Sequence, residues 1–253
     1  FIKLFEKKKL PNVILLTGLK GSGKSTFAYH FINYLFSLNE ENKYSLADFT
    51  INSKNKSYKN LCNKTLPNFF LLENKDFEEN IKIDNVKNLL AFLNKSSLNP
   101  GKRIILIDNA EYLNVNSSNA LLKSLEEPTE NTFFFIIHNS SKKILNTIKS
   151  RCIQFRFHFT FFQKKEILSN ILSQYKSNIN INEISNNFYY DSPGNIFKYL
   201  KFLIDNKIDF SEDKLSCLSY LISSYKKEKE PQLLNFISLL IEMFYNELSI
   251  KNN

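Results

Sequence analysis

The sequence predicts an α/β fold in which helices cover a parallel β-sheet, and two observations support that prediction. Five apolar stretches with the character of strands alternate with stretches of helical periodicity, an order that is typical of parallel sheets. A glycine-rich loop joins the first of these strands to a helix. The expected strands lie near residues 13–17, 69–72, 104–108, 133–137 and 153–157.

The glycine-rich loop is "TGLKGSGKST", residues 17–26, and it holds three of the five glycines in the chain. Its spacing matches G-x-x-x-x-G-K-[ST], with the apolar strand "VILLT" before it and a helix after it. Glycines let backbone amides wrap phosphates, the lysine reaches the outer phosphates, and the hydroxyl can bind Mg²⁺. We therefore predict a P-loop that binds a magnesium nucleotide through Gly18, Gly21, Ser22, Gly23, Lys24, Ser25 and Thr26.

The helix after this loop is expected over "KSTFAYHFINYLF", residues 24–36. Its apolar residues Phe27, Phe31, Ile32 and Leu35 recur at three-and-four spacing and therefore share one face. That face is expected to pack on the sheet.

A second acidic ligand for Mg²⁺ is expected at the end of "RIILID", residues 103–108. Four consecutive apolar residues indicate a central parallel strand, and Asp108 follows at its carboxyl end. A buried strand ending in aspartate is common, so the P-loop upstream is what favours a role in binding Mg²⁺ together with Ser25.

The next residue, Asn109, bears on hydrolysis. Many nucleotide hydrolases have a glutamate at this point, and general-base assistance is worth roughly 10²–10⁴-fold in rate. A neutral amide can orient a water molecule but cannot take its proton at pH 7. Slow hydrolysis is therefore expected even where binding occurs.

The strand expected over "TFFFIIHN", residues 132–139, ends in His138 and Asn139. These side chains could orient water or contact a terminal phosphate, or they could cap the following turn. The residues alone leave both interpretations open.

Composition excludes some classes of protein. A chain of 253 residues with 43% hydrophobic content can bury a substantial core. Its three cysteines form no CxxC pair and have no histidine at ligand spacing, so we expect neither disulfides nor a zinc site, and a cytoplasmic location. Polar residues interrupt the apolar stretch "LLNFISLLIEMFYNEL", so no membrane span is expected. The chain begins at Phe1 rather than Met, so we expect N-terminal residues to be missing.

The formal net charge of +9 has two interpretations. Clustered lysines and arginines would indicate a nucleic-acid partner. Lysines spread through segments such as "NSKNKSYKN", residues 52–60, are equally typical of a solvated surface.

The segment "NALLKSLEEPTENTFFFIIHNSSKKILNTIKSRC", residues 119–152, closely resembles the clamp-loader group of AAA+ proteins. This group contains the gamma/tau and delta-prime subunits of DNA polymerase III and the small subunits of replication factor C. The resemblance implies a P-loop AAA+ module over residues 1–157, a small three-helix lid over 158–206 and a short helical collar over 207–253.

The same resemblance implies two further site residues. In this family the Ser-Arg-Cys triplet carries an arginine finger that acts across a subunit boundary, which here falls on Arg151. The sensor-1 position falls on Asn139. A guanidinium is permanently charged and forked to match phosphate oxygens, which suits a finger.

Three departures favour one member of the group. Gamma/tau motors have an acidic pair at the second motif, a zinc-binding cysteine cluster and a sensor-2 arginine. This chain has Asp108-Asn109, a lone Cys62 and Gly194 at these places. It therefore resembles delta-prime subunits, whose module does not drive hydrolysis, although they often have a degraded P-loop and this one is intact.

A delta-prime resemblance implies a subunit that binds ATP or ADP with Mg²⁺ and is at most a weak ATPase alone. The implied partners are the gamma/tau and delta subunits, the sliding clamp, and primed DNA through the assembled complex. The alternative is an active gamma/tau-like motor. A stand-alone P-loop kinase for a small molecule is a third class, against which the segments "SLEEP" and "SRC" argue.

Overall fold

The computed structural model describes residues 1–74, 80–95, 101–174, 191–206, 208, 214–229 and 231–251. The chain forms two compact units, Phe1–His158 and Phe159–Asn253. The division between them lies next to the boundary expected at residue 157.

The first unit is built on a five-stranded parallel sheet with strand order β2-β3-β4-β1-β5. All five expected strands are present, with ends no more than two residues from the prediction, and the α/β fold class is confirmed. The strands are β1 (Val13–Gly18), β2 (Phe69–Glu73), β3 (Arg103–Asp108), β4 (Thr132–Asn139) and β5 (Ile153–Phe157).

The three central strands β3, β4 and β1 are buried on both faces, which explains their continuous apolar sequences. Successive side chains of a strand point to opposite faces of the sheet. In β1, Leu15 packs in one buried cluster and Leu16 in another, and in β4 Phe134 and Phe135 divide in the same way. Both faces of the sheet must therefore be covered.

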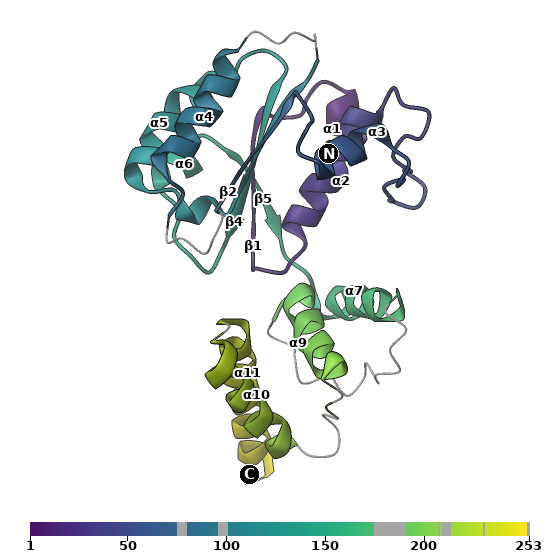
Figure 1. The fold of residues 1–253 in the computed structure, drawn as a ribbon, viewed down its shortest axis with the longest axis vertical. Coiled ribbons are helices and arrows are strands. Elements are labelled where there is room, and N and C mark those ends of the chain that lie inside the picture. The colour runs from purple at the N-terminus through teal and green to yellow at the C-terminus, as the bar shows by residue number, and fades with distance from the viewer. Residues whose placement is uncertain are drawn as a thin grey trace. The chain divides into compact units, whose positions relative to one another are not determined.

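Helices provide that cover on both sides of the sheet (Figure 1). A short 3₁₀ helix, η1 (Ala110–Tyr112), follows β3. One face carries α4 (Ile83–Asn94), α5 (Val115–Glu126) and α6 (Asn146–Lys149). The other face carries α1 (Ile2–Glu6), α2 (Lys24–Ser37) and α3 (Lys56–Cys62).

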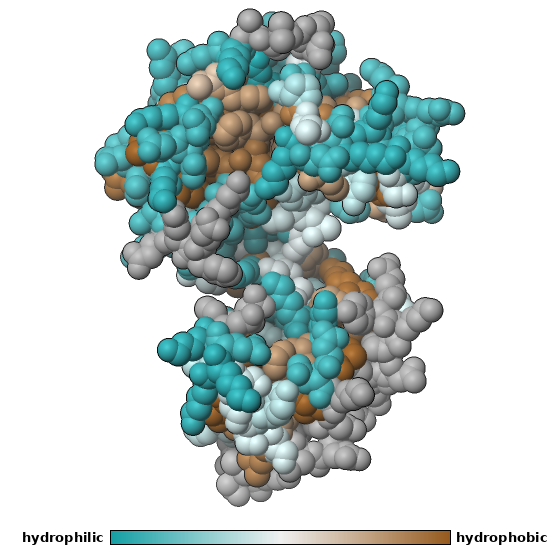
Figure 2. Space-filling model, in the orientation of Figure 1, coloured by the Kyte–Doolittle hydropathy of each residue, from teal (hydrophilic) through white to brown (hydrophobic). Residues whose placement is uncertain are grey.

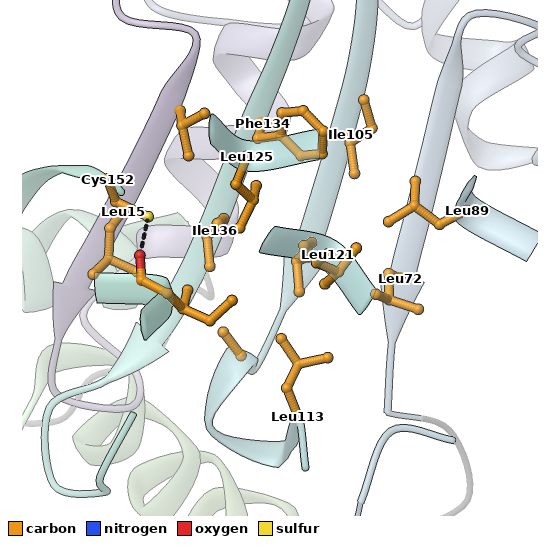
Figure 3. Close-up of a cluster of buried hydrophobic side chains, with 14 of the residues drawn as sticks. Leu15, Leu72, Leu89, Ile105, Leu113, Leu121, Leu125, Phe134, Ile136 and Cys152 are labelled. Atoms are coloured by element: carbon orange, nitrogen blue, oxygen red, sulfur yellow. Dashed lines mark hydrogen bonds between the residues drawn. The ribbon is translucent and has the colours of Figure 1, made fainter. Parts of the chain in front are cut away.

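The apolar faces of these helices pack as their sequences indicate. In α2, Phe31, Ile32 and Leu35 are buried and Phe27 is partly buried against the same cluster, which confirms the predicted face. On the opposite side of the sheet, Leu121 of α5 is completely buried in the cluster that Figure 3 shows.

The secondary-structure elements described in the second unit are all helices. It contains α7 (Phe161–Gln174), α9 (Pro193–Asp205), α10 (Lys214–Glu228) and α11 (Pro231–Lys251). The middle helix expected in the lid falls on residues 175–190, outside the described part of the chain. All four helices contribute to one buried cluster, in which the rings of Tyr199 and Phe236 stack with centroids 4.6 Å apart. The segments expected to form a lid and a collar therefore bury apolar surface together.

Hydrophilic residues cover much of the face of the first unit that is seen in Figure 2. Figure 2 shows hydrophilic residues on the outward sides of its helices and hydrophobic residues between them, where the helices meet the sheet. Among the described helices, none combines the length and the apolar character that crossing a bilayer requires.

We predict that Leu121→Ala destabilises the first unit by about 2–5 kcal/mol, because it removes a fully buried side chain between α5 and the sheet. Val115→Ala, on the same helix but 58% exposed, should change the free energy of unfolding by less than about 0.5 kcal/mol. Urea unfolding followed by circular dichroism would measure both. Equal effects of the two variants would contradict the packing described for α5.

Candidate nucleotide-binding site

Apart from Arg151, the predicted site residues lie at or just after the ends of three neighbouring strands of the sheet. β4 lies between β1 and β3, and all three run in the same direction, so their carboxyl ends meet at one edge. At that edge Gly18 of β1 is in register with Asn139 of β4. The strand order thus brings together the P-loop, Asp108 and the predicted sensor-1 residue, as expected for a ligand site in an α/β sheet.

The glycines of the loop are required by its geometry. A Cβ atom at Gly18 would lie 2.7 Å from the carbonyl oxygen of Phe157 on β5, closer than real Cβ contacts. Gly21 and Gly23 have φ values of 81° and 80°, in the left-handed region that side chains disfavour. Gly23 caps α2, so the loop turns directly into the helix N-terminus, where free N–H groups and the helix dipole favour anions.

Lys24 is held inside the loop. Its Nζ donates to the carbonyl oxygens of Gly18 at 2.9 Å and Leu19 at 2.6 Å and lies 3.4 Å from the Ser22 hydroxyl. The side chain is only 5% exposed. Burial lowers the pKa of Lys24, while the nearby carboxylates of Glu111 and Asp108 act in the opposite direction. The Lys24 ammonium therefore lies inside the loop, in contact with backbone carbonyl oxygens. The oxygens of a phosphate bound in the loop could contact the same ammonium.

Ser25 and Asp108 are in direct contact across the site. The Ser25 hydroxyl donates to Oδ2 of Asp108 at 3.2 Å. Two oxygen ligands side by side next to a phosphate cradle suit Mg²⁺, which takes few protein oxygens and keeps water and phosphate for the rest. Thr26, the remaining predicted loop residue, is exposed in the first turn of α2.

The charge around Asp108 also favours a cation. Burial raises the pKa of Asp108, and the carboxylates of Glu111 and Glu73 raise it further, against the hydrogen bond from Ser25 and the charge of Lys24. The carboxylates of Glu111 and Glu73 thus disfavour the charged form of Asp108, and a divalent ion bound by Asp108 would favour it.

Asn109 has φ 64° and ψ 62° and caps η1. This left-handed conformation is one that asparagine adopts more readily than most residues other than glycine. The backbone conformation at this position therefore suits the asparagine found in the sequence.

His138 and Asn139 both serve the turn after β4. The His138 ring lies between the Thr17 hydroxyl at 3.0 Å and the carbonyl oxygen of Lys142 at 2.9 Å, while Oδ1 of Asn139 accepts from the backbone N–H of Ser141 at 3.2 Å. Of the two interpretations left open by the sequence, these contacts correspond to capping. The sensor role of Asn139 stays a prediction.

Two site residues were missed from the sequence. Oε2 of Glu111 accepts from the backbone N–H of Asn139 at 3.1 Å, which ties the turn after β3 to the end of β4. Burial raises the pKa of Tyr29 to about 12, and the charges of Asp108 and Glu73 act in the same direction. The available signals were the spacing from Asp108 to Glu111 and the four-residue helical spacing from Ser25 to Tyr29.

Arg151 is not among the residues gathered at the P-loop. It follows α6, and its guanidinium contacts Glu126 at the end of α5 and the carbonyl oxygen of Thr147. Its side chain is 27% exposed. No described contact joins Arg151 to the loop of its own chain, so it is placed apart from the site that Lys24 defines.

Cysteines form no metal cluster in the described residues, nor do histidines or acidic residues in groups of three or more. Cys62 is exposed, whereas Cys152 and Cys217 are buried, and all three are free thiols.

The sequence of this chain is similar to those of known proteins. A family model described as DNA polymerase III, delta subunit, matches residues 1–160. The DNA polymerase III subunit delta' of Pseudomonas aeruginosa is 35% identical over 140 residues, which cover 55% of this chain and 41% of that protein. The subunit delta' of Buchnera aphidicola subsp. Schizaphis graminum is 26% identical over 219 residues, covering 81% of this chain and 65% of that protein.

A gamma subunit is also similar. The DNA polymerase III subunit gamma of the same Buchnera is 25% identical over 254 residues, covering 98% of this chain and 56% of that protein. The chain thus spans between 41% and 65% of the length of these curated relatives. Because the family model matches more than half of the chain and the relatives named first are delta-prime subunits, the chain belongs to the delta-prime clamp-loader family of DNA polymerase III.

Proposed function

We propose that this chain is a delta-prime subunit of a DNA polymerase III clamp loader. In this role it binds ATP or ADP with Mg²⁺, hydrolyses little of it, and supplies Arg151 to the ATP site of a neighbouring subunit. The observation that carries the proposal is the pairing of a complete P-loop with an amide, Asn109, directly after the predicted Mg²⁺ ligand Asp108.

Nucleotide binding is supported by the geometry of the loop and the edge beside it. The backbone of Gly18–Gly23 wraps the start of α2, and Lys24 lies buried at its centre. Ser25 and Asp108 would hold Mg²⁺, which would neutralise charge on the phosphates. Binding exchanges the contacts of Lys24 with loop carbonyls for contacts with phosphate oxygens.

Slow hydrolysis is supported by the groups that lie near the predicted phosphate position. Asn109 cannot accept a proton at pH 7, and Oε2 of the Glu111 carboxylate already accepts a hydrogen bond from the backbone of Asn139. Gly194, at the predicted sensor-2 position, is the second residue of α9 and has no side chain to contribute.

Action in trans is supported by the position of Arg151. An arginine apart from its own P-loop, partly exposed and held by its chain, fits a finger that serves another subunit. Partners of the proposed assembly are gamma/tau and delta subunits, with the sliding clamp and primed DNA as its targets, and its proposed location is the cytoplasm.

An active gamma/tau-like motor is the second candidate function. The intact loop and the similarity to a gamma subunit over 98% of this chain favour it. Asn109 and Gly194 argue against it, because neither provides the side chain that the motor subunits have at that position.

We expect the chain to bind magnesium ATP and Lys24→Ala to abolish binding, because Lys24 places its ammonium inside the loop, whereas the other lysine of the loop, Lys20, is exposed. Isothermal titration calorimetry would measure both. Lys123→Ala, an exposed lysine of α5 outside the site, is the matched control and should bind normally. Absence of binding heat at millimolar ATP for the unchanged protein would refute nucleotide binding.

The isolated chain is expected to show almost no steady-state ATP hydrolysis, and Asn109→Glu should raise the rate only partly. Glutamate provides a base but must adopt the left-handed backbone of Asn109, and the finger of a partner is missing. Asn109→Gln is the control, because glutamine has the same length as glutamate but lacks its carboxylate. Vigorous turnover by the unchanged chain would assign it to the motor subunits.

Arg151→Ala should leave folding, nucleotide binding and complex assembly unchanged while lowering clamp- and DNA-stimulated hydrolysis and clamp loading. A finger is worth about 10³–10⁵-fold at the one site that it serves. Arg151→Lys should restore little because a point charge lacks the planar fork. Lys149→Ala, exposed in the same segment, controls for loss of positive charge. The proposal would be overturned if clamp loading were lost with Lys24→Ala but unchanged with Arg151→Ala.

A further inference from the structure

We propose that Glu126 is a positioning residue for Arg151: it holds the guanidinium in the orientation in which the finger serves a neighbouring subunit. This inference rests on the proposed role of Arg151 and adds a residue to it. The two residues come from the separate segments "SLEEP" and "SRC", which meet where α5 ends and α6 is followed by β5.

The contacts of Arg151 fix both ends of its guanidinium. Nε donates to Oε1 of Glu126 at 2.7 Å, and Nη2 donates to the same oxygen. Nη1 donates to the carbonyl oxygen of Thr147 at 2.7 Å. A guanidinium has five N–H donors, and these contacts use three of them. One N–H on each terminal nitrogen therefore has no partner among the described residues and can meet phosphate oxygens from outside.

The segment that carries Arg151 is itself anchored, so Glu126 acts on a side chain whose backbone is fixed. Cys152 is buried, and its thiol donates to the carbonyl oxygen of Ile148 at 3.1 Å (Figure 3). Burial raises the pKa of this thiol to about 12, so it remains protonated. Ile148 and Leu125 share the same buried cluster. The remaining freedom lies in the long Arg151 side chain.

A purely stabilising ion pair explains Glu126 poorly. The two side chains are 27% and 48% exposed, and exposed pairs contribute little to folding. Glu126 is the last residue of α5, where the helix dipole disfavours negative charge, and Glu127 adds a second carboxylate there. Only Glu126 of these two contacts the arginine.

Glu127 provides a matched control because it is adjacent, exposed and equally charged. In a clamp loader reconstituted with the full-length chain, Glu126→Ala should lower the kcat of clamp- and DNA-stimulated ATP hydrolysis by about 3- to 100-fold at the served site, since a misplaced group can cost up to about 10²-fold. The KM for ATP should stay unchanged, and Glu127→Ala should match the wild type.

Two more variants separate positioning from charge. Both donors of Arg151 reach one oxygen, so Glu126→Gln, which keeps a carbonyl oxygen, should retain most of the rate. In an Arg151→Ala background, Glu126→Ala should cause no further loss. Equal loss in Gln and Ala variants, or additive loss in that background, would overturn the positioning role.

A measurement without the assembly completes the test. In the isolated chain, the Arg151 Nε–H should exchange with solvent faster in Glu126→Ala than in Glu127→Ala, as followed by NMR. Unchanged exchange would overturn the inference. If Arg151→Ala leaves hydrolysis unchanged, the proposed roles of Arg151 and Glu126 are both refuted. If Arg151→Ala lowers hydrolysis but Glu126→Ala does not, only the role of Glu126 is refuted.

Discussion

Burial of β4 between β1 and β3 is the constraint on which the site depends. Because β4 is apolar on both faces and bonded along both edges, the ends of its neighbours cannot shift independently. The carboxyl ends of three strands are thereby set next to one another. The apolar packing of these strands therefore sets the positions of the polar groups at that edge, including the P-loop, Asp108 and Glu111.

The polar groups above this packing already satisfy one another. Lys24 bonds to its own loop, Ser25 to Asp108, and Glu111 to the backbone of Asn139. In the proposed nucleotide-binding role, phosphate oxygens would replace these side-chain contacts and would also meet the free N–H groups at the start of α2. The net gain per exchanged bond is small, so in that proposed role the charges of Mg²⁺ and phosphate would provide much of the affinity.

The elements with strong local signals could be predicted from the sequence, and those set by tertiary contact could not. Continuous apolar runs gave the five strands, and the glycine spacing gave the loop, because both patterns act over a few residues. Glu111 and Tyr29 have only a short spacing from Asp108 and from Ser25 as a local signal, and many residues share such a spacing; the turn after β3 and the second turn of α2 bring them to the site. Likewise, nothing local indicates that Glu126 meets Arg151, since 25 residues separate them.

The unequal burial of the three cysteines has a practical consequence for chemical labelling. Burial raises the pKa values of Cys152 and Cys217 to about 12 and about 11, which leaves both thiols protonated and shielded at neutral pH. Cys62, at the end of α3, is exposed. A thiol-reactive fluorophore would therefore attach at one native position, on the face of the sheet opposite α5 and Arg151, and could report on assembly without an engineered cysteine.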